Sequence, residues 1–370
     1  MRAKKAIYII LFICLISANQ NSVAQEIGKA QPNGSGQLYV NAFNEMRLML
    51  QDSIKPDFKR SVFITENAFN DGRLSYDGFN KLIGKYSNII KAYINTNPLP
   101  YEGSDRDNVA KNYAIYQFMC DTIWLTKDKA LHYPYTYDFD DFACEKDWSG
   151  MFVTKLLQTQ KGNCHSMPFL YKILAEELGA EAYLSLAPYH MYIKTRSEKT
   201  GWFNTELTNG MFPIDAWVAA SGYVSLDAMR SGIYMDTLGL KQSIAFCLYD
   251  LAKGCEKKYG FRQFPFIFDC LNLALEYYPN FINAKIYKAE CLKKRFDTYM
   301  VFYDTKDYKN ILQYEKPKEI YDEMEAIYVK ILNLGFREMP PKMYREWIMS
   351  LKDNKEKYQN NKIFNILHSK

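Results

Sequence analysis

This sequence of 370 residues contains only four histidines and lacks the motifs of several large protein classes. No C-x-x-C or H-E-x-x-H spacing occurs, so zinc held by Cys164, His165 and His190 is an alternative without a supporting motif. No phosphate-binding loop or dinucleotide fingerprint is present, because Asn33-Gly34-Ser35-Gly36 does not join a predicted strand to a helix. No basic stretch with interleaved aromatic residues stands out, so nucleic acid is not an expected partner. The sequence therefore predicts no cofactor and no resident metal ion.

The first 24 residues have the composition of a secretory signal. Three basic residues lie within the first five positions, an apolar run covers residues 6–18, and Ser22-Val23-Ala24 offers small residues for cleavage. The mature chain is expected to begin at or near Gln25, and losing those three cations reduces the formal charge from +5 to +2. The apolar run is too short for a confident membrane span, so an uncleaved anchor is the less favoured alternative and would be the only membrane contact. We expect an exported protein, periplasmic or extracellular.

Seven cysteines remain after residue 24, and an odd number in an exported protein leaves at least one thiol outside intramolecular disulfides. Cys164 is the natural candidate for that thiol. The remaining six can be paired or simply buried, and nothing in the sequence decides the pairing. They are Cys120, Cys144, Cys247, Cys255, Cys270 and Cys291.

The first part of the mature chain reads as a linker followed by helices. Residues 25–36 are polar and rich in glycine, which is typical of a linker. Residues 37–130 are predicted to form an N-terminal helical segment, because apolar residues recur every three or four positions along 38–50 and 82–93. A further helix is expected over residues 113–125.

Residues 131–236 are predicted to form an α+β core. A helix is expected over 167–178, where an apolar face ends at a glycine. Alternating apolar residues predict a strand over 182–195 and another over 201–208, with a possible third at 211–217. One helix followed by an antiparallel meander gives this core.

Residues 237–370 read as helical to the end. The segment 270–280 and the small residues after it resemble the second helix of a tetratricopeptide repeat and the start of the next, with a weaker echo at 328–340. No clean 34-residue period is found, so two or three packed helical hairpins are the safer expectation. This region would hold a protein partner or the substrate.

Three side chains able to act as nucleophile, base and orienter occur in order, each in a different predicted element. Cys164 directly precedes a helix, whose dipole lowers the pKa of a thiol. His190, on a strand, would take the thiol proton and later deliver it to a leaving amine, while Glu206 on the next strand would hold the imidazole in the right tautomer. Asp215 and Asn204 are lower-ranked alternatives for the third residue.

The oxyanion formed during acyl transfer would need the backbone N–H of Cys164 and one further donor, for which Gln158 and Gln160 are upstream candidates. The aromatic stretch 133–142 could line a cleft beside the thiol. The favoured interpretation of that stretch is a surface loop whose rings pack inward, because exposed aromatic residues alone are weak evidence for a site.

The motifs around these side chains follow a recognisable order. Lys161-Gly162-Asn163-Cys164 is followed by a helix ending in Leu178-Gly179, then by His190 on a strand, and then by Trp202 and Thr208 bracketing Glu206. In this order the residues from about 131 to 215 resemble the transglutaminase-like core, which is a papain-like thiol fold. The resemblance implies that the helix bearing the cysteine packs on an antiparallel sheet, flanked here by N-terminal helices and a C-terminal region of helical hairpins.

Members of this superfamily are acyl-transfer enzymes, peptidases or amidases, and some have lost catalysis. The resemblance implies catalytic roles for Cys164, His190 and Glu206, and Trp202 and Gln160 are expected to bind substrate. We expect hydrolysis or exchange of amide bonds in a peptide, a protein or a cell-wall peptide. The family has Asp where this chain has Glu206, and this difference favours the rival hypothesis of an inactive scaffold that binds partners through its helices.

Overall fold

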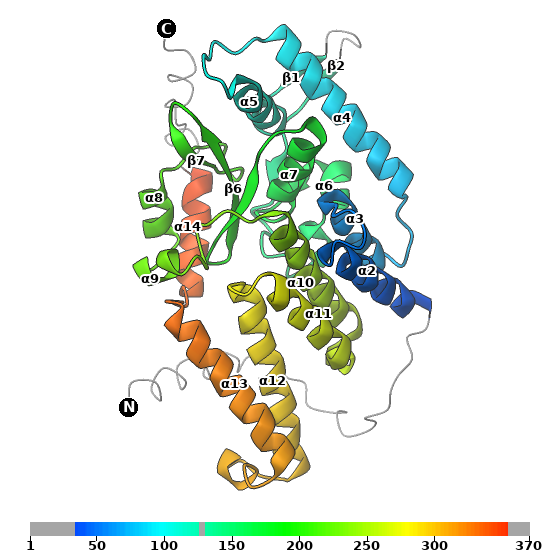
Figure 1. Ribbon diagram of the computed structural model, residues 1–370, viewed down its shortest axis with the longest axis vertical. Coiled ribbons are helices and arrows are strands. Elements are labelled where there is room, and N and C mark those ends of the chain that lie inside the picture. Colours follow the sequence, from blue (N-terminus) through cyan, green and yellow to red (C-terminus); the bar gives the residue numbers. More distant parts are fainter. Residues whose placement is uncertain (1–33, 126–129, 354–370) are drawn as a thin grey trace.

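The computed structural model describes residues 34–125 and 130–353, so the predicted signal at 1–24 and most of the predicted linker lie outside the described residues. Within them the chain is α+β and mostly helical, which confirms the coarse fold class. A three-stranded antiparallel sheet lies near the middle of the molecule with helices around it (Figure 1). No helix among these residues has the length and apolar character needed to cross a membrane.

The N-terminal part consists of α2 (Gly34–Leu50), α3 (Phe58–Phe69), α4 (Tyr76–Thr96) and α5 (Arg106–Cys120). Asp57 and Ser75 cap the first turns of α3 and α4, because each side chain accepts a backbone N–H of that turn. Both apolar stripes expected from the sequence face the core: Met46, Ile83 and Ile90 are fully inaccessible to solvent, and the other members are buried or partly buried. The periodicity therefore identified the core-facing side of these helices.

Two boundaries in this part differ from the prediction. Helix α2 begins at Gly34, inside the predicted linker. The helix expected over 113–125 ends earlier, with α5, and is followed by strand β1 (Ile123–Leu125), which pairs antiparallel with β2 (Ala130–His132). The apolar residues after α5 continue the helical spacing, but pairing with a second strand decides their conformation.

The middle of the chain alternates short strands and helices. Strand β3 pairs parallel with β4, and the main sheet has the order β5-β6-β7 with both neighbouring pairs antiparallel. Helix α7 starts one residue before its predicted start and ends at Gly179, whose φ of 65° is a left-handed conformation that glycine adopts readily. The elements are β3 (Thr136–Tyr137), the 3₁₀ turn η1 (Trp148–Met151), α6 (Val153–Thr159), β4 (Lys161–Gly162), α7 (Ser166–Leu178), β5 (Tyr183–Ala187), β6 (His190–Ser197) and β7 (Gly201–Thr205).

The strands differ from the prediction in two places. The single strand expected over 182–195 is two strands, β5 and β6, joined by a tight turn in which Tyr189 has a φ of 57°. The third strand expected at 211–217 does not form. Met211 makes one isolated bridge to Glu206, and helix α8 (Asp215–Ser221) begins shortly after it.

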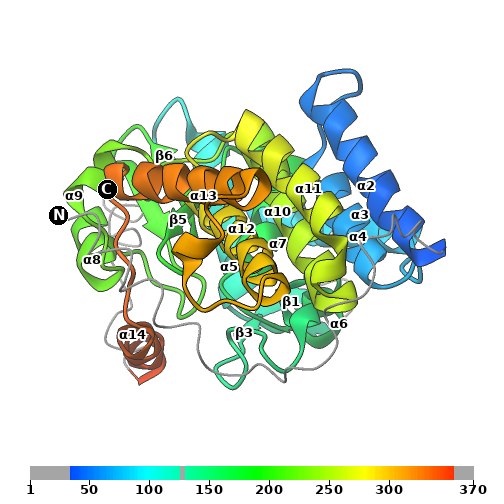
Figure 2. The same cartoon turned by 90° about the horizontal axis from the view of Figure 1, so that it is seen from below.

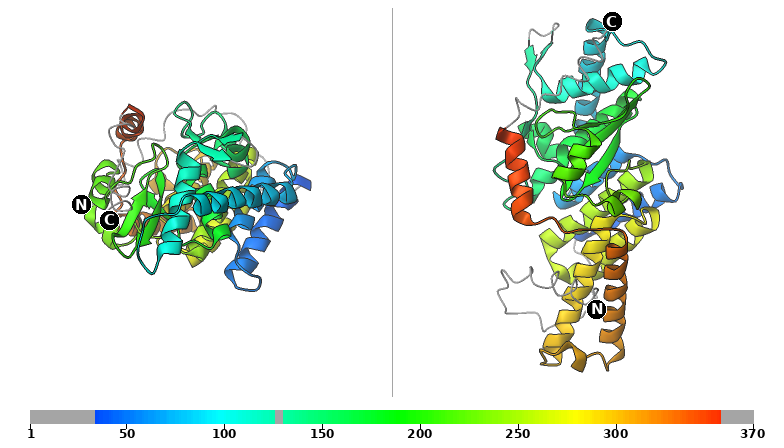
Figure 3. Two further views of the ribbon diagram at one scale, coloured as in Figure 1. Left: turned by 90° about the horizontal axis from the view of Figure 1, so that it is seen from above. Right: turned by 90° about the vertical axis from the view of Figure 1, so that its left-hand side faces the viewer.

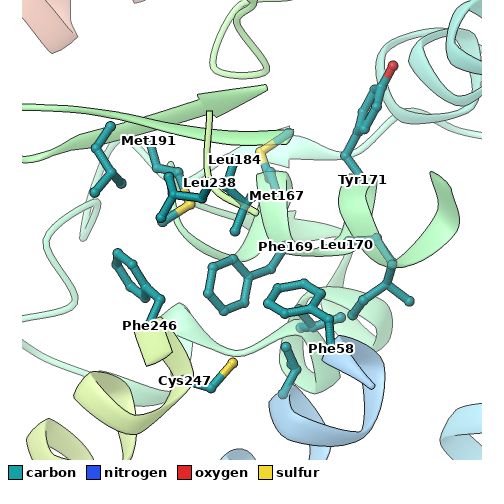
Figure 4. Packing of buried hydrophobic residues seen from close by; sticks show 14 of the residues in the cluster. Phe58, Met167, Phe169, Leu170, Tyr171, Leu184, Met191, Leu238, Phe246 and Cys247 are labelled. Atoms are coloured by element: carbon teal, nitrogen blue, oxygen red, sulfur yellow. The ribbon is translucent and has the colours of Figure 1, made fainter. Parts of the chain in front are cut away.

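A continuous apolar core joins α7 to its neighbours on every side (Figure 4). Phe169 of α7 packs edge-on against Phe58 of α3, with ring centroids 5.1 Å apart, and against Phe246 of α10 (Leu240–Tyr259) at 5.8 Å. On the sheet side the core includes Leu184 of β5 and Met191 of β6. The N-terminal and C-terminal helices therefore share one core with the sheet, and packing does not break at the predicted boundary near residue 237.

The C-terminal region is helical, as expected, with α10 packed on α11 and α12 packed on α13. In Figure 1 the α12–α13 pair projects from the bottom of the molecule. Its likeness to tetratricopeptide repeats stays a prediction. The other elements that follow α8 are α9 (Leu226–Arg230), η2 (Phe261–Gln263), α11 (Phe264–Tyr277), α12 (Ile282–Phe302), η3 (Tyr308–Asn310), α13 (Glu315–Asn333) and α14 (Pro341–Asp353).

Helix α14 does not continue the stack of helices before it. The irregular segment 336–340 carries the chain away from α13, so that α14 stands apart from α12 and α13 (Figure 2). It lies beside the central sheet (Figure 3). Trp347, Ile348 and Leu351 form its buried side. The last described helix therefore returns to the part of the molecule that holds Cys164 and His190.

Candidate active site

Cys164 lies in a tight loop between β4 and α7. The side-chain oxygen of Asn163 accepts the N–H groups of His165 and Ser166, each at 3.0 Å, and Ser166 Oγ accepts the N–H of Asn163 at 3.1 Å. These bonds leave the backbone N–H of Cys164 without a partner among the described residues. Gly162 leads into the loop, where a Cβ would approach Ser166 Oγ to 2.6 Å.

His190 and Glu206 meet because they belong to adjacent strands: His190 begins β6, and Glu206 directly follows β7. His190 Nε2 lies 2.5 Å from Glu206 Oε2, and the other carboxylate oxygen accepts the N–H of Thr208 at 2.8 Å. Only 4% of His190 and 3% of Glu206 is exposed. His190 Nδ1 is buried and has no hydrogen-bond partner among the described residues, so it is the nitrogen available for proton exchange with a thiol.

The electrostatics of these side chains favour a thiolate beside an imidazolium. Burial alone would raise the pKa of Cys164, but His190 outweighs burial, with help from Tyr137 and Tyr344, and the pKa is lower than usual. Burial lowers the pKa of His190, yet Glu206 and Cys164 raise it to about 10. Burial raises the pKa of Glu206, but the interaction with His190 outweighs burial and holds this pKa below its usual value. Cys164 keeps partial solvent exposure, as a reactive thiol must.

Two tyrosines from distant parts of the chain flank this thiol. Tyr137 of β3 comes from the aromatic stretch 133–142, and its ring is buried, as the favoured interpretation of that stretch expects. Its hydroxyl helps to lower the pKa of Cys164. The hydroxyl of Tyr344 on α14 lies 3.8 Å from Cys164 Sγ and donates to the carbonyl of Tyr189 at 2.9 Å. The phenol of Tyr344 thus reaches the sulfur from α14, while the phenol of Tyr137 on β3 acts on the thiol electrostatically.

Helix α14 also covers His190. The ring of Trp347 lies against the imidazole, with centroids 4.9 Å apart and an angle of 63° between the planes. The Trp347 ring also contacts Trp217 of α8 at 6.2 Å. The sequence analysis missed Tyr344 and Trp347, because an amphipathic pattern predicts a helix without indicating the surface on which it packs.

The alternatives for the third residue are engaged elsewhere. Asn204 Nδ2 donates to Asp215 Oδ1 at 2.8 Å, and Lys194 Nζ donates to the same oxygen at 3.2 Å. Asp215 is the first residue of α8 and has no contact with His190 among those described. Glu206 is therefore the carboxylate that can orient the imidazole.

Trp202, an expected substrate-binding residue, lies at the far end of β7. It precedes Glu206 by four positions, which is about 13 Å along an extended strand. Its ring packs edge-on against Tyr183 with centroids 5.8 Å apart, and 47% of the residue is exposed. The motif position of Trp202 thus does not bring it to the thiol.

Gln160, the other expected substrate-binding residue, ends α6 in a left-handed conformation with φ of 55°. Its backbone carbonyl accepts the N–H of Thr136 at 2.8 Å and so helps to join β3 to β4. Within the described chain, no hydrogen bond connects the side chain of Gln158 or Gln160 to Cys164. Neither amide is positioned here as an oxyanion donor.

The zinc alternative lacks a converging ligand set. His165 Nδ1 bonds to the carbonyl of Met151 and His165 Nε2 to Asp250 of α10, each at 2.9 Å. His165 thus ties the nucleophile loop to the C-terminal helices and does not join Cys164 and His190 around one point. Across residues 34–125 and 130–353, no group of three or more potential ligands gathers.

Five further cysteines are buried and have the properties of structural residues. Burial raises the pKa of Cys144, Cys247, Cys255, Cys270 and Cys291, and none of these five forms a disulfide. This contrast with Cys164 is what a reactive thiol among structural ones requires.

Comparison of the chain with protein-family models, with curated proteins and with solved structures finds no match. The function must therefore be argued from the geometry around Cys164 alone.

Proposed function

We propose that this chain is an exported thiol enzyme with a transglutaminase-like core, acting on amide bonds through Cys164, His190 and Glu206. The proposal rests mainly on a buried imidazole whose Nε2 lies 2.5 Å from a carboxylate and whose Nδ1 has no partner among the described residues, beside a partly exposed cysteine. A cysteine kept only for packing has no need of a charged partner that lowers its pKa.

The reaction follows from these positions. The thiolate attacks the amide carbon, so the C–S bond forms while the carbonyl electron pair moves onto oxygen. When the oxyanion collapses, the C–N bond breaks and His190 Nδ1 gives its proton to the leaving amine. Water then attacks the thioester, His190 accepts a proton from it, and the thiolate leaves. Replacing water by an amine would give acyl transfer, but no acceptor-lysine site is indicated, so hydrolysis is favoured.

The substrate class is a peptide, a protein or a cell-wall peptide outside the cytoplasm. The C-terminal helices would hold the substrate or a partner. Export is tested by the intact mass of the secreted or periplasmic protein, which should correspond to a chain beginning near Gln25. Exported material that still contains Met1 would contradict cleavage.

An inactive scaffold is the second candidate, and one observation favours it: α14 lies over the site, with Tyr344 at the sulfur and Trp347 on the imidazole. Such a scaffold would keep the thiol fold for its shape and bind partners through the helices. Its cysteine would then behave as an ordinary thiol.

The pH profile for alkylation of Cys164 by iodoacetamide separates the two candidates. An activated thiol should react rapidly below pH 7, whereas an ordinary thiol follows a pKa of about 8.5. Cys164→Ala should abolish amide hydrolysis and the fast phase of labelling while leaving the circular dichroism spectrum unchanged. Cys144→Ala, which removes a buried cysteine nearby, is the matched control and should change neither. Equal hydrolysis by Cys164→Ala and the wild type would remove the enzyme hypothesis.

A further inference from the structure

Tyr137 carries a buried hydroxyl that no described residue satisfies. Its ring packs against Phe139 with centroids 4.8 Å apart, 7% of the residue is exposed, and the hydroxyl oxygen has no hydrogen-bond partner among the described residues. An unsatisfied buried hydroxyl costs stability, so its retention needs an explanation.

The backbone fixes this hydroxyl relative to the nucleophile. Tyr137 lies opposite Gly162 in the parallel β3–β4 pair, and Gly162 precedes Cys164 by two residues. The N–H of Asp138 donates to the carbonyl of Gly162 at 2.7 Å. The N–H of Thr136 likewise donates to the carbonyl of Gln160 at 2.8 Å, so the residues on both sides of Tyr137 are bonded to the segment that leads to the thiol. The position of Tyr137 is therefore set before any substrate arrives.

The β3–β4 pairing brings Tyr137 to the start of the nucleophile loop, and Cys164 is the charged group with the largest effect on its hydroxyl. Burial raises the pKa of Tyr137, and the charge on Cys164 raises it further, while Tyr137 in turn helps to lower the pKa of the thiol. The other phenol near the sulfur is committed elsewhere, because Tyr344 donates its proton to the carbonyl of Tyr189. Tyr137 is therefore the phenol whose proton remains available.

We propose that the Tyr137 hydroxyl is the second donor of the oxyanion hole, acting together with the unpartnered backbone N–H of Cys164. This inference rests on the proposed thiol chemistry. As the C–S bond forms, negative charge leaves the sulfur and appears on the carbonyl oxygen attached one carbon away. The buried, unpartnered O–H of Tyr137 then donates a hydrogen bond to that oxygen, and this bond is lost when the oxyanion collapses. No proton is transferred by Tyr137.

Two reactions of the same thiol test this role in Tyr137→Phe. Alkylation by iodoacetamide is a displacement without an oxyanion, whereas acylation by p-nitrophenyl acetate passes through a tetrahedral oxyanion. Rates are compared at the high-pH plateau of each protein, where any change in the thiol pKa no longer matters. We expect acylation to slow on the order of 10²-fold, as for loss of one oxyanion donor, with alkylation within about threefold of the wild type.

Tyr135→Phe is the matched control, because this substitution removes the same hydroxyl group two residues away. Its hydroxyl is also buried and unpartnered, but its ring packs against His132 and Phe118, at 5.9 and 6.1 Å between centroids. Both rates should stay at the wild-type level in this control, and a thermal melt checks the fold of each variant.

The outcomes are distinct. Unchanged acylation in a folded Tyr137→Phe protein would overturn the inference, and so would an equal fall in both reactions, which would assign Tyr137 to holding the thiolate. Wild-type acylation no faster than that of Cys164→Ala would instead overturn the proposed function, and the inference with it.

Discussion

Replacing Glu206 with glutamine removes one negative charge while keeping the shape of the side chain. In the wild type Glu206 Oε2 lies 2.5 Å from His190 Nε2, and this carboxylate is the largest influence that raises the pKa of His190 to about 10, against the lowering effect of burial. Without it, only Cys164 opposes the effect of burial, and the pKa of His190 should fall well below its wild-type value. Cys164 then loses its cationic neighbour, and the pKa of its thiol should rise to at least that of an ordinary thiol, about 8.5.

The assay is the rate of Cys164 alkylation by iodoacetamide between pH 5 and 10. A thiol of pKa about 8.5 is under about 1% ionised at pH 6, so the rate at pH 6 should fall roughly 10- to 100-fold while the plateau at high pH changes little. Hydrolysis of an amide substrate should fall on the order of 10–10³-fold, which is less than in a serine triad because a thiol ionises more readily.

Asp215→Asn is the control, because the same chemical change is made at a carboxylate that bonds to Asn204 and Lys194. It should leave the alkylation profile unchanged and affect stability alone. An unchanged profile in Glu206→Gln would refute the thiolate–imidazolium pair. Greater damage to turnover from Asp215→Asn would show that the third residue is misassigned.

Three further changes probe the surroundings of the site. Burial raises the pKa of Glu66 from 4.5 to about 7. The free energy of unfolding should therefore be highest below pH 4.5 and decline by roughly 3 kcal/mol as the pH rises through 7. Glu66→Gln should remove this decline, as measured by urea unfolding at about pH 4.5 and about pH 8. Tyr344→Phe deletes one hydrogen bond of α14, worth about 1 kcal/mol, so the plateau rate of Cys164 alkylation should rise about fivefold, and an unchanged rate would mean that the helix does not limit access. Gly162→Ala forces a Cβ to within 2.6 Å of Ser166 Oγ and should cost about 1–3 kcal/mol, so an unaltered melting temperature would contradict the tight packing described here.

The features that the sequence predicted are those encoded by nearby residues. Helix α7 follows from apolar residues at helical spacing, and its end follows from a glycine that adopts a left-handed conformation. The order of Cys164, His190 and Glu206 was likewise visible, and the strands bring the last two together as expected. The hairpin between β5 and β6 was missed because apolar residues continue on both sides of Tyr189, and only strand pairing reveals that the chain folds back there.

The features that the sequence did not predict depend on contacts between distant segments. Tyr344 and Cys164 are 180 residues apart, and no periodicity in residues 341–353 states which surface that helix meets. Trp202 was expected to bind substrate because it occurs close to Glu206 in the motif. In the structure it lies at the opposite end of β7 and packs against Tyr183. The local sequence pattern thus predicted the reactive side chains, whereas the residues that surround them depend on tertiary packing.

Helix α14 belongs to the same chain as the thiol that it covers, so the encounter between them is intramolecular. A short connection such as 336–340 gives a tethered group an effective concentration of about millimolar. A substrate at micromolar concentration competes poorly with such a neighbour unless it binds far more tightly. Cutting the connection would dilute the helix to its concentration in bulk solution and let it dissociate. In the proposed enzyme, the length of this connection would therefore help to set the substrate concentration at which the site begins to fill.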